Sequence, residues 1–189
     1  MKKFKVIILV TGLFLFGSLT GQSNGTQKND IERISLAVFM PANNQGMTPS
    51  ARNALIKKMN QIATNNGFGD DVFTKRFILT SKVNILTQNL TPTAPPMHAY
   101  TLNVTFYIGD AVTGTKFSNF SKTIKGIGTS EANAFNQALR NIKTSDVAFR
   151  NFINTGKQKI TKAYSNIGVD NIKNQSQKET YNYNAISRW

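Results

Sequence analysis

The stretch Tyr100-Thr-Leu-Asn-Val-Thr-Phe-Tyr-Ile108 decides the fold. Large apolar residues occupy every second position, and mostly polar residues stand between them. This alternation is typical of a β-strand with one buried side and one side facing solvent. Residues 110–114 have the composition of a hairpin turn, and residues 116–127 follow with the pattern of a returning strand. The centre of the chain is therefore predicted to be an antiparallel meander.

Two further strands are predicted upstream. Residues 73–88 are rich in β-branched and aromatic side chains, which favours a strand. Residues 90–96 contain three prolines and are predicted to be a loop, because proline cannot donate to a sheet ladder. Residues 34–40 alternate again and end at Pro41, so they predict a mostly buried strand.

Helices are predicted on both sides of the meander. Thr48 followed by Pro49 is a strong helix start, and the apolar spacing that follows predicts a helix over residues 49–66. A second helix is expected after Thr129 or Ser130, with apolar residues at helical spacing up to Ile142. Beyond it, Ser145 is the expected cap of a further helical piece, which Gly156 is expected to interrupt.

These elements predict the fold class and the domain boundaries. Antiparallel strands flanked by helices favour an α+β two-layer domain, with a mainly antiparallel sheet of about four strands and helices on one face. One domain is expected over residues 32–165.

The first 21 residues have the order of a secretory signal peptide. Three lysines precede an apolar run from Val6 to Phe16, and small residues follow up to Gly21. The run is shorter than the roughly 20 residues that span a bilayer. Leu19-Thr-Gly21 matches the approach to a lipoprotein cysteine, but Gln22 stands in its place, so ordinary cleavage is expected there. Residues 22–31 are predicted to be a flexible lead, and the protein to be exported to the periplasm or the extracellular space.

The charge of the chain indicates the kind of partner. The formal net charge is +14, and the chain contains no cysteine. Such an excess attracts lipid headgroups, anionic glycans or other acidic surfaces, and a peripheral membrane contact fits this pattern. The alternative is a solubilising charge spread over every face. Because the lysines are scattered, no specific nucleic-acid binding is expected.

Residues suited to catalysis are scarce. The chain has nine acidic residues and one histidine, His98, which lacks a second histidine or a cysteine to complete a metal site. The glycines of residues 125–130 lack the spacing of a nucleotide-binding loop. No catalytic residue, metal or cofactor is therefore predicted. The alternative is an exported hydrolase or lytic factor with a hidden site built from carboxylates near turns. The candidates are Asp70, Asp71, Asp110 and Glu131.

The tail over residues 166–189 is predicted to be largely disordered, because it is rich in asparagine, glutamine, lysine and serine. It ends in aromatic residues that suit docking on a partner. The candidate docking residues are Tyr181, Tyr183, Arg188 and Trp189. If the tail is disordered, deletion of residues 170–189 leaves the melting temperature nearly unchanged.

The stretch from Ile34 to Ile142 resembles the small α+β envelope domains of the TolB amino-terminal and curli-secretion lipoprotein class. The likeness rests on the first strand and the helix after Thr48, on the alternation up to Ile108, and on Gly126-Ile-Gly-Thr-Ser-Glu-Ala before the second helix. The resemblance implies a non-enzymatic role in assembling or bridging envelope components. The sequence thus favours an exported, non-catalytic cell-envelope accessory protein that binds envelope proteins or anionic surface polymers.

Overall fold

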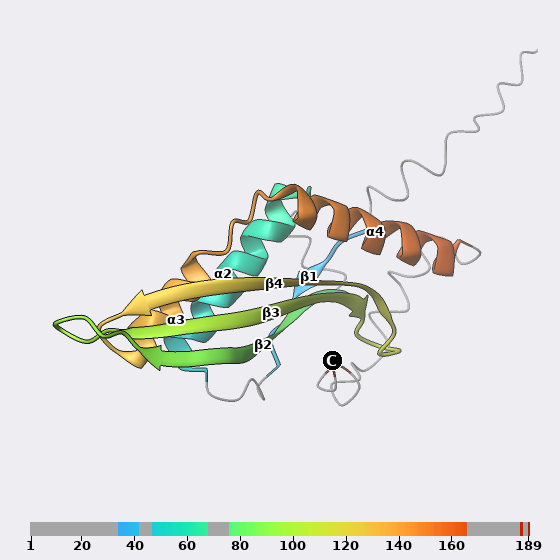
Figure 1. Cartoon of the computed structure of the whole chain (residues 1–189). Helices are drawn as coiled ribbons and strands as arrows, with labels where there is room; N and C mark the ends of the chain where they lie inside the picture. Colours follow the sequence, from blue (N-terminus) through green and yellow to red (C-terminus); the bar gives the residue numbers. More distant parts are fainter. Residues whose placement is uncertain (1–33, 42–46, 68–75, 166–185, 187–188) are drawn as a thin grey trace, which may run out of the picture.

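The computed structural model describes residues 34–41, 47–67, 76–165, 186 and 189, and it has an α+β fold (Figure 1). The predicted leader over residues 1–21, the lead over 22–31 and most of the tail lie outside these residues. The elements in chain order are β1 (Ala37–Val38), α2 (Pro49–Asn65), β2 (Phe77–Leu90), β3 (His98–Asp110), β4 (Lys116–Gly128), α3 (Glu131–Arg140) and α4 (Val147–Tyr164).

One four-stranded sheet runs in the order β1-β2-β3-β4. β2, β3 and β4 are antiparallel, and β3 is paired with both neighbours along almost its full length. β1 is parallel to β2 and pairs only at two positions, Ala37 with Ile78 and Val38 with Leu79. The parallel pairing follows from the connection, because α2 carries the chain back before β2 begins. The predicted, mainly antiparallel sheet is confirmed.

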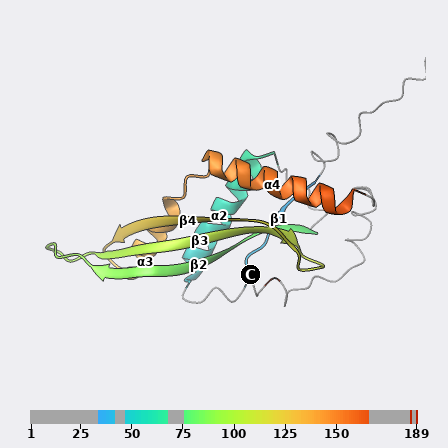
Figure 2. The same ribbon diagram turned by 45° about the vertical axis from the view of Figure 1, so that its right-hand side comes forward.

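The helices cover one face of the sheet, as expected. Leu102, Val104, Phe106 and Ile108 of β3 are completely buried there, and the residues between them are half-buried on the other face. The buried cluster joins these side chains to apolar residues of α2, α3 and α4. In Figure 1 the strands lie in front of α2 and α3, and Figure 2 shows the same layers from another side.

The first residues of α2 and α3 agree with the sequence predictions, and the cap of α4 differs from the predicted one. The Thr48 hydroxyl accepts a hydrogen bond from the Ala51 amide at 3.2 Å, and Ser130 caps α3 in the same way. α4, however, is capped by Asp146 and not by Ser145. The carboxylate of Asp146 accepts a hydrogen bond from Ala148 N at 3.1 Å and forms an ion pair with Lys122. A carboxylate suits this place because it also interacts favourably with the helix dipole.

Three glycines serve close packing, in contrast to the helix interruption that the sequence predicts at Gly156. α4 continues through Gly156, where an added Cβ would lie 2.6 Å from Cδ1 of Ile108. β4 likewise continues through Gly126 to Gly128, and a Cβ on Gly126 would lie 2.2 Å from the carbonyl oxygen of Ala134. The missing side chains let α3 and α4 lie directly on the sheet.

Candidate functional site

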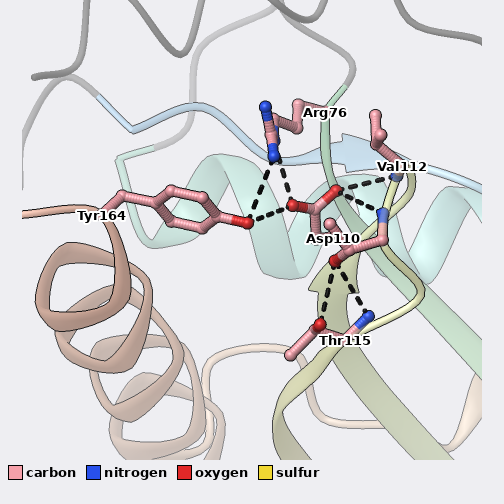
Figure 3. A network of polar contacts seen from close by, with 6 residues as sticks. Arg76, Asp110, Val112, Thr115 and Tyr164 are labelled. Carbon is pink, nitrogen blue, oxygen red and sulfur yellow. Dashed lines mark hydrogen bonds and ion pairs between the residues drawn. The ribbon is translucent and has the colours of Figure 1, made fainter. Parts of the chain in front are cut away.

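A buried polar cluster stands at the end of β3 (Figure 3). Asp110 is completely buried, and its Oδ2 accepts hydrogen bonds from Arg76 Nε at 3.0 Å and from the Tyr164 hydroxyl. Its Oδ1 accepts from the amides of Val112 at 2.8 Å and Thr113 at 3.2 Å, which form the hairpin turn. Arg76 also donates to Tyr164, at 3.3 Å.

The geometry of this cluster indicates a structural role, in which it holds neighbouring elements together. Both oxygens of Asp110 are occupied, and the side chain of Arg76 is only 6% exposed. A buried ion pair that is fully hydrogen-bonded fixes the elements it joins, and removal of one partner leaves an uncompensated charge. Burial, followed by the hydrogen bond to Asp110, raises the pKa of the Tyr164 hydroxyl above its usual value near 10. The cluster therefore joins the start of β2, the end of β3 and the end of α4.

The carboxylates proposed for a hidden hydrolase site do not converge in the described part of the chain. Glu131 lies at the start of α3 and accepts a hydrogen bond from Gln88 Nε2 at 2.8 Å. It lies near the start of β3, whereas Asp110 ends that strand, and a strand of this length spans about 40 Å. Asp70 and Asp71 lie outside the described residues.

No metal site is found among the residues that the structure describes, since no three His, Cys, Asp or Glu side chains gather there. His98 is the first residue of β3 and is paired in the sheet with Leu90 and Gly128. A hollow along α2 is lined by that helix alone within the described chain, with polar side chains such as Asn53 and Asn60. It brings no titratable groups together from different elements.

The face of the sheet opposite the helices is open and polar, and it is the strongest candidate for a binding surface. We call it the open face. The register aligns its side chains in rows across the three long strands, and Thr105 and Ser121 share a hydrogen bond of 2.8 Å. The open face comprises Lys82, Asn84, Thr101, Asn103, Thr105, Ser121, Thr123 and Lys125.

The open face carries positive charge that no nearby carboxylate balances within the described residues. Lys82 and Lys125 are exposed on it. The described carboxylates lie elsewhere: Asp110 is buried, Glu131 is on α3, and Asp146 caps α4. Hydrogen bonding to Lys122 lowers the pKa of Asp146, which keeps this carboxylate ionised at neutral pH. The open face therefore presents cations and hydrogen-bonding groups toward solvent.

Trp189, a predicted docking residue, is buried and not exposed for a partner. It is 8% exposed and lies on the same side of the sheet as the open face, beyond the row of side chains that begins with Lys82. Its ring centroid is 6.3 Å from that of Tyr107, and Lys116 Nζ lies 5.9 Å above it. A Cβ on Gly109 would come within 1.9 Å of the indole.

The remainder of the docking prediction stays untested. Tyr181, Tyr183 and Arg188 lie outside the described residues. Ile186, the other described tail residue, is 1% exposed and belongs to the same small cluster as Trp189. The apolar end of the tail is thus part of a second, smaller core.

Sequence reasoning missed Arg76 and Tyr164 as partners of Asp110. The turn role of Asp110 was readable, because aspartate at the start of a turn accepts hydrogen bonds from amides two or three residues ahead. Its long-range partners were not, since Arg76 is separated from it by 34 positions and Tyr164 by 54.

Comparisons with known proteins place few limits on function. The chain matches no family model and no curated protein. A candidate lipoprotein from Caulobacter crescentus is similar in structure, with 10% identity and a TM-score of 0.36 over 81% of this chain and 97% of that chain. A minor lipoprotein from Acinetobacter baumannii has 19% identity and a TM-score of 0.34 over 69% and 90% of the two chains. None of the described helices is long and apolar enough to cross a membrane.

Proposed function

We propose that this protein is an exported, non-catalytic accessory protein of the cell envelope, in the periplasm or the extracellular space. In this proposal it binds acidic envelope proteins or anionic surface polymers. The order of charged, apolar and small residues over positions 1–21 supports export. The scattered carboxylates of the described residues support a binding role more than a reaction.

The observation that carries the proposal is the positive charge of the open face, which no side-chain carboxylate of the described residues balances. Lys82 and Lys125 stand exposed among hydroxyl and amide side chains, while Asp110 and Asp146 are already paired with Arg76 and Lys122. Surfaces with one sign of charge raise the local concentration of oppositely charged partners and speed their association. An anionic partner would also find hydrogen-bond donors on the same surface.

The proposal is tested with two probes, polyglutamate for acidic protein and polygalacturonate for anionic polymer. We expect the purified protein to sediment with one of them at low salt and to be released as salt shortens the Debye length to a few ångströms. Lys82→Glu with Lys125→Glu should weaken binding about tenfold, which corresponds to about 1.4 kcal/mol.

The matched control makes the same charge change away from the open face. Lys57→Glu with Lys159→Glu alters exposed lysines of α2 and α4, and should weaken binding much less. Equal weakening by both pairs would assign the binding to diffuse charge. No sedimentation with either probe at low salt would refute the proposed function.

A further inference from the structure

Among the described residues, β2 has a free edge along most of its length. β1 pairs with it only at Ile78 and Leu79, so no described strand lies beside the later part of β2 on that side. In Figure 1, β3 lies between β2 and β4, so β2 is one of the two outer strands among the three long ones. We call residues 83–90 the free β2 edge.

The direction of the main-chain groups on this edge follows from one hydrogen bond. The Phe39 amide donates to the carbonyl oxygen of Leu79 at 3.0 Å, so Leu79 directs its main-chain groups toward β1 and away from β3. Residues of a strand alternate in this direction, and the pairing of β2 with β3 is regular up to Ile85. Val83 and Ile85 therefore direct their N–H and C=O groups away from the sheet.

The side chains of the free β2 edge are unusually apolar for an exposed strand. Ile85 is 49% exposed, Leu86 is 52% exposed and Leu90 is 64% exposed. Proteins commonly protect such edges with charged residues, proline or a covering element. On β2 the charged side chain nearest to this segment is Lys82, which precedes it. The bulge between Ile85 and Thr87 is the one protective device on the described strand.

The opposite edge of the sheet, β4, is protected. α3 packs on β4, with the backbone of Ala134 and Ala138 against Gly126. The side chain of Asn141 donates to the carbonyl oxygen of Lys125 at 2.8 Å and so caps an outward main-chain group. Lys122 and Lys125 add charge along the strand. β4 has one exposed apolar side chain, Ile127, at 55% exposed, whereas the free β2 edge has three, those of Ile85, Leu86 and Leu90.

We propose that the free β2 edge binds an extended segment of an acidic partner protein, which joins the sheet as an added strand. The inference rests on the proposed function and names the type of partner and its site. Strand addition takes its affinity from main-chain hydrogen bonds and its specificity from alternate side chains. The net charge of +14 disfavours a second copy as occupant and favours a partner with acidic side chains.

The probe is a fluorescein-labelled peptide of alternating valine and glutamate, about ten residues long to match a strand. Its binding to the full chain is measured by fluorescence anisotropy at low salt. Ile85→Pro removes an outward N–H without breaking a bond to β3, and it should weaken binding about tenfold or more. Ile85→Thr keeps the N–H and should retain most of the binding.

Two controls separate strand addition from simple charge attraction. Ile127→Pro removes an outward N–H of β4, since Ile127 faces the same way as Lys125 two residues earlier, and it should leave binding unchanged. A peptide methylated at every main-chain amide keeps its charge but has no N–H to donate along either edge, so it should lose binding to the unaltered protein. This second measurement does not depend on the folding of a variant.

Several results would overturn the inference. The first is absence of peptide binding at about 1 mM, and the second is equal binding of the methylated peptide. A dimer that excludes the peptide and dissociates with Ile85→Pro would assign the edge to a second copy. If the Ile85→Pro protein still sediments with polyglutamate and also binds the valine–glutamate peptide at full strength, the proposed function stands and the edge site fails.

Discussion

Replacement of Trp189 by alanine tests the placement of the chain end on the sheet. The indole packs in a small cluster with Ile78, Ala111 and Ile186, on the side of the sheet opposite the helices. It lies so close to Gly109 that no side chain fits between them. Trp189→Ala therefore removes a large buried group and leaves a cavity beside the outer side of β3.

The expected loss of stability follows from the burial of the ring. Truncation of a buried aromatic side chain to alanine costs about 3–5 kcal/mol, and a terminal residue lets its surroundings relax, so we expect about 3 kcal/mol. For a chain of this length each kcal/mol lowers the melting temperature by about 2–4 °C. The melting temperature of Trp189→Ala should therefore fall by about 6–12 °C.

The assay is favourable because Trp189 is the only tryptophan in the chain. Its fluorescence should be blue-shifted and protected from iodide in the folded protein, and both properties should disappear on unfolding. Val147→Ala, at a residue that is 61% exposed, is the matched control and should change the melting temperature by about 1–2 °C at most. An emission maximum typical of water-exposed tryptophan, with an unchanged melting temperature for Trp189→Ala, would refute the packing and restore the predicted free tail.

Three further predictions concern the interior. Asp110→Ala should lower the free energy of unfolding in urea by about 3–5 kcal/mol, because Arg76 is left charged and buried; a loss under about 1 kcal/mol would show that water solvates that guanidinium. Gly126→Ala should destabilise by more than about 2 kcal/mol because its Cβ meets the backbone of α3, whereas unchanged stability would mean that the helix shifts freely. The raised pKa of the Tyr164 hydroxyl stabilises the folded state below the usual tyrosine pKa near 10, and this contribution is lost as pH rises through the raised value. Tyr164→Phe should therefore flatten the fall in the free energy of unfolding above pH 10. Identical slopes of this free energy against pH for the two proteins would contradict the assigned burial.

The sequence by itself determined the elements and their layering. The alternation of residues 100–108 predicted β3, and Thr48 with Pro49 predicted the start of α2, because these signals arise among neighbouring residues. The polar residues of the same alternation also indicated which side of the sheet faces solvent. The open face could therefore be predicted from the sequence, although the free β2 edge could not.

Only the tertiary structure decided what each special residue does. Gly156 resembled a helix interruption until Ile108 was found beside it, and Trp189 resembled a free docking residue until Gly109 was found beneath it. The free β2 edge likewise depends on how few residues of β1 pair with β2. Such roles are set by contacts between segments that are distant in the chain, and the local periodicity of a sequence carries no record of these contacts.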